Sequence, residues 1–126
     1  MRRRALSPNI LAFGDAAVDI VTRLSGFPRR GGDVEVTYIK RQPGGSAANF
    51  SVAVNRLGMS SGFIGKIGSD EAGQFLHDDL VREGVDVEYL RRGAGPTGTV
   101  IALVEKTGCR TMLSFRGVNV TFAPNE

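Results

Sequence analysis

The chain has 126 residues, of which 41% are hydrophobic and 23% are charged, and its net charge is +3. This length and composition are sufficient for a buried core and exclude a disordered chain. Apolar runs of only a few residues exclude a membrane-spanning helix, which needs roughly 20.

Short strands alternate with polar turns in the first third of the chain. Residues 9–15 form an apolar run that ends in a glycine and an acid, which predicts a strand buried on both faces. Residues 17–24 and 33–41 alternate in polarity, and a turn over 28–32 separates them. We therefore expect these two segments to pair as half-exposed antiparallel strands.

Two helices are expected in the middle of the chain. Apolar residues recur at helical spacing over 47–57, and Gly58 stands where a left-handed C-terminal cap belongs. Residues 69–84 repeat this pattern, with Asp70 or the serine before it as the N-cap. Residues 61–68, between the two helices, predict a second buried strand.

The last third of the chain predicts strands only. Residues 85–90 indicate another strand, and residues 97–117 indicate a β-hairpin whose turn lies over 106–108. Some of the predicted strands alternate in polarity whereas others are continuously apolar, so two sheets of different character are implied. The fold class is therefore an α/β core that carries a separate antiparallel sheet built from two distant segments.

A pair of glycines, Gly44 and Gly45, stands directly before the first predicted helix in the stretch PGGSAANFSVAVNRLG, residues 43–58. Glycine costs conformational entropy unless the backbone adopts an unusual dihedral angle or lets another group come close. The pair therefore predicts a ligand at the start of this helix.

The longer stretch GGSAANFSVAVNRLGMSSGFIGKIG, residues 44–68, resembles the N-terminal signature of the ribokinase-like (PfkB) carbohydrate kinases. It has the Gly-Gly pair, a small residue two positions on, Asn49, a small Ser51, and then Gly58 and Gly68. The flanking blocks GDAAVDIV, GSDEAGQFLHDDLVREGVD and TGTVIALVEKTGCRTMLSFRGVN extend the resemblance over nearly the whole chain.

The resemblance implies a ribokinase-like three-layer α/β/α core, incomplete in this chain, with a small antiparallel β-sheet lid. Residues 1–126 would be the N-terminal part of the kinase domain, and segments of about 17–42 and 97–117 would form the lid. A lid of this kind closes over a bound sugar and excludes water from phosphoryl transfer.

The resemblance also implies a set of substrate-binding residues: Asp19, Gly44, Gly45 and Asn49, with Arg116 as a cation for acidic sugars. A sugar offers hydroxyl groups that both donate and accept, so a carboxylate, an amide and bare backbone suit it. The alternatives are structural: Asp19 as an exposed strand acid, Asn49 as a helix-cap or surface amide, and Arg116 as an ordinary strand-end arginine.

The matched residues cover only the sugar-binding half of such a kinase. Within the 126 residues there is no Gly-Ala-Gly-Asp-like stretch and no Asn-x-x-Glu block, so no catalytic and no metal-ligating residue is assigned. ATP and Mg²⁺ are expected for the complete family member, and neither is expected to bind this chain alone. The alternatives are a non-catalytic sugar-binding or interaction fragment, and a nucleoside in place of the sugar.

The expected partners are a small-molecule sugar and a second copy of the chain, paired through the lid strands. Nucleic acid is not expected, because the basic residues are scattered and no aromatic residues are interleaved with them. No membrane partner is expected. The N-terminal basic residues are followed by Pro8 and Asn9, which suits a signal peptide poorly, so we expect a cytoplasmic location.

Overall fold

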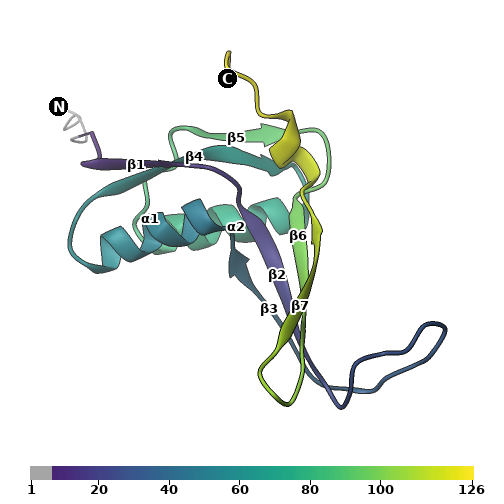
Figure 1. Cartoon of the computed structure of the whole chain (residues 1–126). Helices are drawn as coiled ribbons and strands as arrows, with labels where there is room; N and C mark the ends of the chain where they lie inside the picture. The colour runs from purple at the N-terminus through teal and green to yellow at the C-terminus, as the bar shows by residue number, and fades with distance from the viewer. Residues whose placement is uncertain (1–6) are drawn as a thin grey trace.

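The structure, a computed structural model, describes residues 7–126 as two β-sheets, two α-helices and a short 3-10 helix (Figure 1). The first sheet has three strands in the order β1-β4-β5, and the second has four in the order β3-β2-β6-β7. In chain order the elements are β1 (Ile10–Phe13), β2 (Ala17–Leu24), β3 (Val36–Gly44), α1 (Ser46–Arg56), β4 (Ser61–Gly68), α2 (Glu71–Arg82), β5 (Leu90–Gly93), β6 (Gly98–Val104), β7 (Arg110–Phe115) and η1 (Gly117–Thr121).

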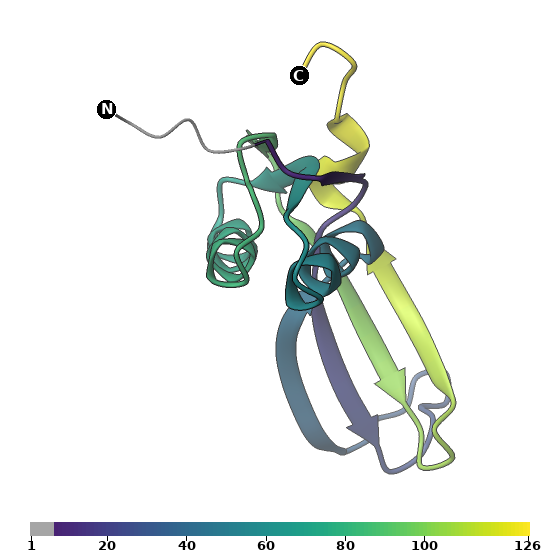
Figure 2. The ribbon, with the colours of Figure 1, turned by 90° about the vertical axis from the view of Figure 1, so that its left-hand side faces the viewer.

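Both helices cover the same face of the three-stranded sheet, while the four-stranded sheet projects away from it (Figure 1 and Figure 2). The strands of the first sheet are parallel, with β4 between β1 and β5. Phe63 and Ile67 of β4 are fully buried under the helices, where they join a core cluster with Ala48 of α1 and Leu76 and Leu80 of α2. The predicted α/β core is therefore present as two layers.

The other face of the first sheet has no helix of the described chain packed along β1. Leu11 and Phe13 of β1 are 48% and 67% exposed, and only Ala12, which faces the helices, is buried. The expectation that residues 9–15 are buried on both faces is therefore wrong, because β1 is an edge strand covered from one side. β4 is buried along nearly its whole length, as predicted.

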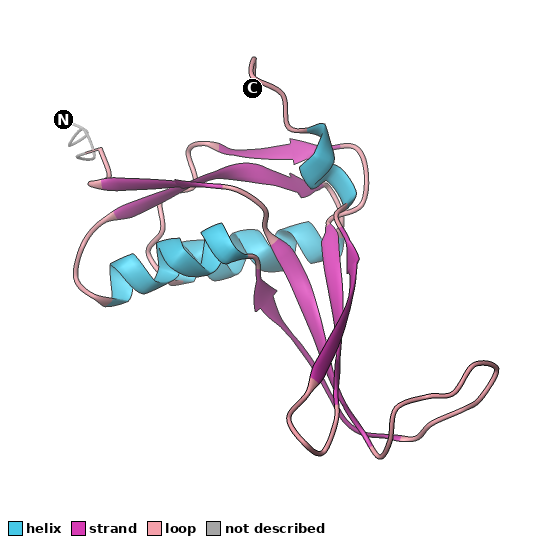
Figure 3. Cartoon of the chain, viewed as in Figure 1, coloured by secondary structure: helices cyan, strands magenta, loops and turns pink. Residues whose placement is uncertain are grey.

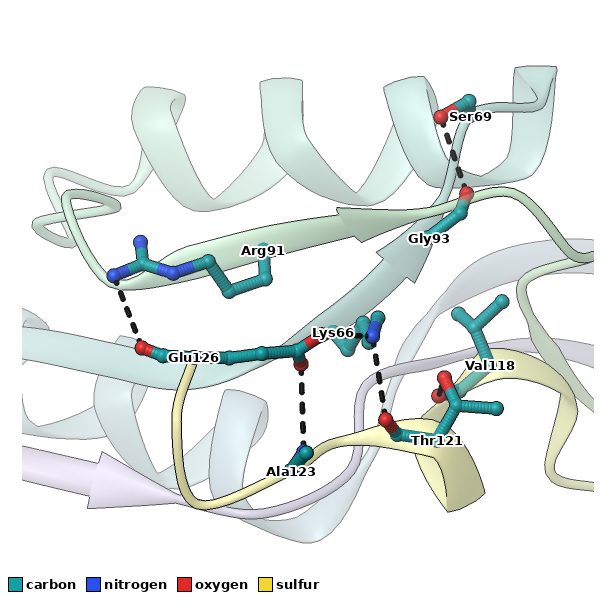
Figure 4. Close-up of polar contacts among 8 residues, drawn as sticks. All are labelled: Lys66, Ser69, Arg91, Gly93, Val118, Thr121, Ala123 and Glu126. Carbon is teal, nitrogen blue, oxygen red and sulfur yellow. Dashed lines mark hydrogen bonds and ion pairs between the residues drawn. The ribbon is translucent and has the colours of Figure 1, made fainter.

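The segment after η1 crosses part of this second face and satisfies a buried ammonium group there (Figure 4). Lys66 of β4 donates to the backbone oxygen of Thr121 at 3.3 Å and forms an ion pair with Glu126. Arg91 of β5 donates to the backbone oxygen of Glu126 at 3.4 Å. Polar contacts of this kind are required where a charged side chain is buried.

The four-stranded sheet is only partly antiparallel (Figure 3). The outer pairs β2-β3 and β6-β7 are antiparallel, but β2 and β6 at its centre are parallel, with Ala17 beside Gly98 and Arg23 beside Val104. The expected small antiparallel sheet is therefore mostly antiparallel, with one parallel pair at its centre. β2 and β6 both run away from the first sheet, so their pairing is parallel. The strands joined by a hairpin-like connection, β2 with β3 and β6 with β7, run in opposite directions.

The helix ends agree with the signals in the sequence. α1 is preceded by Gly45 at φ 99°, and Gly58 after its C-terminus has φ 90°. The carboxylate of Asp70 accepts a hydrogen bond from the backbone N–H of Gly73 at 2.9 Å, so Asp70 is the N-cap of α2. Neither helix described in residues 7–126 is long and apolar enough to cross a membrane.

Two predicted strands are displaced. β3 covers residues 36–44 rather than 33–41, because it continues to Gly44 beside Ala17. The strand predicted at 85–90 is only partly present: Asp86 forms an isolated parallel bridge with Gly62 of β4, and β5 begins at Leu90. A turn closed by Leu90 N–H donating to Val87 C=O at 3.0 Å occupies the intervening residues.

Candidate functional site

Asp19 and Gly44 lie against each other where the second sheet meets the core. Asp19 is on β2, and its register neighbours Gln42 of β3 and Val100 of β6 lie on the same face of the sheet. Gly44 is diagonal to it, and a Cβ atom on Gly44 would overlap the Asp19 carboxylate. Only glycine at position 44 therefore leaves room for this carboxylate.

The carboxylate of Asp19 is half-buried and lacks a compensating partner. Burial raises the pKa of Asp19 above its ordinary value, and no hydrogen bond or opposite charge among the described residues offsets that effect. A ligand that brings hydrogen-bond donors to such a carboxylate would stabilise its charged form.

The backbone of Gly45 packs closely against the backbone of Asp15 and Ala16. Its φ of 99° is in the region that favours glycine, and a Cβ atom there would lie 2.8 Å from the Cα of Ala16 and overlap the carbonyl oxygen of Asp15. Its own carbonyl oxygen accepts the backbone N–H of Asn49 at 2.9 Å, which begins α1. The two glycines thus bring the start of α1 against the start of β2.

Asn49 is in the first turn of α1, and its side chain is exposed. It lines a groove of about 590 Å³ that runs between β3 and the two helices, together with Lys40, Gln42 and Asp79. Gln42 is also the register neighbour of Asp19. Gln42 thus links the groove to the strand position of Asp19, although Asp19 itself does not line the groove and no hydrogen bond joins Asn49 to Asp19 within residues 7–126.

Arg116 lies apart from this group, at the end of β7. Its Nε and Nη2 atoms donate to the two carboxylate oxygens of Asp15 at 2.8 and 3.0 Å. The hydrogen bonds that Arg116 donates to Asp15, and to a smaller extent the negative charge of Asp15, raise the pKa of Arg116. The guanidinium group is therefore engaged with a residue of the β1–β2 connection, 101 positions earlier in the chain.

The structure thus brings together Asp19, Gly44 and Gly45, places Asn49 one helical turn further on, and leaves Arg116 with Asp15. The sequence alone points to no role for Asp15 or for Asn119, whose amide contacts the backbone of Ala16. Neither residue belongs to a periodic pattern. Over residues 7–126, no three side chains of histidine, cysteine or acidic residues are grouped as a metal ion would require.

Comparison with known proteins gives a consistent result at three levels. Residues 7–126 match the sequence model described as "pfkB family carbohydrate kinase". The chain is 37% identical over 107 residues to a fructokinase from Klebsiella pneumoniae. This aligned region covers 84% of this chain and 31% of that protein. It is 40% identical over 92 residues to an aminoimidazole riboside kinase from Salmonella typhimurium, and this aligned region covers 73% of this chain and 25% of that protein.

A solved structure shares the fold. The ribokinase from Cryptococcus neoformans in complex with ADP superimposes with a TM-score of 0.79 and is 26% identical, covering 88% of this chain and 35% of that one. The chain thus spans only 25–35% of the length of these three relatives.

Proposed function

The chain belongs to the pfkB family of carbohydrate kinases, and from that premise we propose that it forms the sugar-binding and lid part of a sugar kinase. The observation that carries the proposal is the Asp19 carboxylate, half-buried against Gly44 with no protein donor to stabilise it. Two neighbouring hydroxyl groups of a sugar would donate to it and offset the cost of burying the charge.

The other residues of the proposed site follow from the same geometry. Gly44 and Gly45 present bare backbone beside the carboxylate, so a sugar ring can approach without a side chain in the way. The amide of Asn49 supplies both a donor and an acceptor to the groove that Gln42, the register neighbour of Asp19, also lines. The ion pair of Arg116 with Asp15 supports a structural role for that arginine, and an acidic sugar would have to compete with Asp15 for it.

The four-stranded sheet would serve as the lid. Asp19 is on one of its central strands, so movement of the sheet relative to the core would close over a sugar bound at Asp19. Excluding water from the site in this way favours phosphoryl transfer over hydrolysis.

We propose that the complete protein uses ATP and Mg²⁺ to phosphorylate a sugar hydroxyl and that residues 1–126 alone do not. The proposal is supported by the ADP complex of the similar ribokinase and by the fraction of each relative that this chain spans. ATP turnover that scales with the concentration of the pure 126-residue protein, in the presence of D-fructose or D-ribose, would contradict it. The alternative is a fragment that binds sugar or another subunit without catalysis.

A nucleoside is the second candidate substrate, since one relative is an aminoimidazole riboside kinase.

We further propose that two copies pair through their lids and that the protein works in the cytoplasm, without nucleic acid or membrane as a partner. The face of the lid opposite Asp19 supports pairing, because Ile20, Ile101 and Leu113 are neighbours in register there. Neighbouring exposed apolar side chains are a common feature of interaction sites.

Titration calorimetry with D-fructose, D-ribose and aminoimidazole riboside tests the site. We expect Asp19→Ala to weaken binding by at least about tenfold and Asn49→Ala by about fivefold, because hydrogen bonds to a charged acceptor are the stronger ones. Asp33→Ala removes a carboxylate from the exposed β2–β3 connection and serves as the matched control. Unchanged affinity in a folded Asp19→Ala protein would refute the site and return Asp19 to the role of a surface acid.

A further inference from the structure

The side-chain amide of Asn119 forms hydrogen bonds with both backbone polar groups of Ala16, as a neighbouring strand would. Its Oδ1 accepts the Ala16 N–H at 3.2 Å, and its Nδ2 donates to the Ala16 carbonyl oxygen at 2.9 Å. Ala16 is fully buried and Asn119 is 8% exposed, so water does not compete for these bonds. Both backbone groups of one residue are thus paired with one side chain from 103 positions further along the chain.

The same amide is enclosed by other elements of the lid. Nδ2 of Asn119 also donates to the carbonyl oxygen of Arg116 at 2.8 Å, at the end of β7. A Cβ atom on Gly98, the first residue of β6, would overlap that nitrogen. Asn119 therefore lies where β2 and β6 begin and β7 ends, which is the base of the lid.

The ion pair between Arg116 and Asp15 holds the same two segments together from outside. It joins the residue before Ala16 to the residue where β7 gives way to η1, through two hydrogen bonds of 2.8 and 3.0 Å. One contact is buried and neutral, and the other is exposed and charged. Together they fix the β1–β2 connection on both sides of its backbone.

This connection supports the candidate sugar site. Ala16 immediately precedes β2, three residues before Asp19, and its Cα would lie 2.8 Å from a Cβ atom on Gly45. We propose that Asn119, assisted by the Asp15–Arg116 pair, is a positioning residue that holds Asp19 against the Gly44–Gly45 backbone. The inference rests on the proposed sugar-binding function, but the position of Asp19 is measurable without a sugar.

A purely structural role is the competing explanation, and Asn55 provides a matched control for it. Asn55 also uses both ends of its amide to join distant backbone: Oδ1 accepts from Ser61 N–H at 2.8 Å, and Nδ2 donates to the Glu83 carbonyl oxygen at 3.2 Å. It lies in the last turn of α1, away from β2. Asn55→Ala therefore removes comparable hydrogen bonds without touching the base of the lid.

The test compares Asn119→Ala, Asn55→Ala and the unaltered chain by NMR. We expect Asn119→Ala to speed amide exchange at Ala16 by at least about tenfold and to bring the measured pKa of Asp19 back toward its ordinary value, as its burial is lost. Asn55→Ala should change neither quantity. Arg116→Gln, a substitution of an exposed side chain, should give the same two changes to a smaller extent and serves if Asn119→Ala does not fold.

Sugar titration of the same proteins separates the two proposals. With D-fructose or D-ribose, whichever binds the unaltered chain, Asn119→Ala should raise Kd by about tenfold, a loss of about 1.4 kcal/mol, and Asn55→Ala should not. If no sugar binds the unaltered chain, the proposed function fails, and the NMR comparison still decides the role of Asn119. The inference is overturned if the pKa of Asp19 and the exchange of Ala16 respond alike to both asparagine substitutions, or if they do not respond to Asn119→Ala or Arg116→Gln.

Discussion

At the scale of single residues, the candidate site depends on the absence of a side chain at Gly44. Its backbone does not require positive φ, so the need for glycine comes from the Asp19 carboxylate that occupies the space of a Cβ atom. The site therefore depends on two packed residues: Asp19 contributes the negative charge, and Gly44 leaves the space that the Asp19 carboxylate occupies.

We expect Gly44→Ala to displace the Asp19 side chain, to lower stability by about 1–3 kcal/mol, and to abolish sugar binding. Thermal melts and calorimetric titration check the two effects. Gly26→Ala is the control, because a Cβ atom there meets nothing within 4 Å. A Gly44→Ala protein with unchanged sugar affinity would show that the carboxylate does not need its present position.

Asp70 allows a prediction about pH with a defined sign. Burial acts to raise the pKa of Asp70, but hydrogen bonds from Thr97 and from the Gly73 N–H outweigh it and lower the pKa. A carboxylate with a lowered pKa stabilises the fold above its ordinary pKa and loses that contribution as the pH falls through the folded value.

Asp70→Ala should therefore cost about 1 kcal/mol at neutral pH, as the loss of an N-cap does, and the difference from the unaltered chain should shrink in acid. Urea unfolding at about pH 7 and about pH 3 measures it. Asp86→Ala is the comparison, since within residues 7–126 the Asp86 carboxylate accepts a hydrogen bond only from the nearby Glu88 N–H. A cost that does not depend on pH would show that the Asp70 carboxylate is not held by these hydrogen bonds.

At the scale of elements, local patterns predicted the helices and the hairpin but not every pairing of strands. The helix expected over 47–57 is α1, shifted by one residue at each end, because spacing and capping are local signals. The parallel pairing of β2 with β6 joins segments about 80 residues apart, for which no local pattern exists. Val85 and Val87 alternate as in a strand, yet the pairing with β4 there is a single bridge at Asp86, and the chain turns after Val87.

The same distinction holds for the site. Gly44 and Asn49 could be proposed from the sequence because the family signature spans them, and Asp19 because it lies in a flanking block of the same resemblance. Asn119 could not, since a side-chain amide that pairs with the backbone 103 residues earlier leaves no spacing or composition signal. Contacts between distant segments form only when the chain folds, so local sequence patterns do not predict them.

The lid sheet also carries a prediction about self-association. Leu113 and Met112 are adjacent on β7 and almost equally exposed, at 55% and 54%, but they face opposite sides of the sheet. We expect Leu113→Glu to convert a dimer to a monomer, because it places a charge among Ile20 and Ile101, and we expect Met112→Glu to leave the dimer intact.

Sedimentation velocity at high micromolar concentration distinguishes these results. A monomeric unaltered chain, or two variants that dissociate equally, would show that this face of the lid is not the interface.

At the scale of the whole molecule, the two sheets have different tasks. The three-stranded sheet and its two helices supply the buried core, while the four-stranded sheet carries Asp19 away from it on β2. The Gly44–Gly45 backbone is the junction at which the two meet. A sugar bound there, as we propose, would contact both parts at once, and lid closure would then respond to sugar.

The most direct test of sugar binding at Asp19 is an NMR titration of the 126-residue chain with D-fructose and with D-ribose, following every backbone amide. We predict that one of these sugars perturbs the amides of Asp19, Gly44, Gly45 and Asn49 most strongly, and that Asp19→Ala removes the perturbation. Saturating sugar that leaves these amides unchanged, or that perturbs them equally in the Asp19→Ala protein, would contradict the assignment of the site.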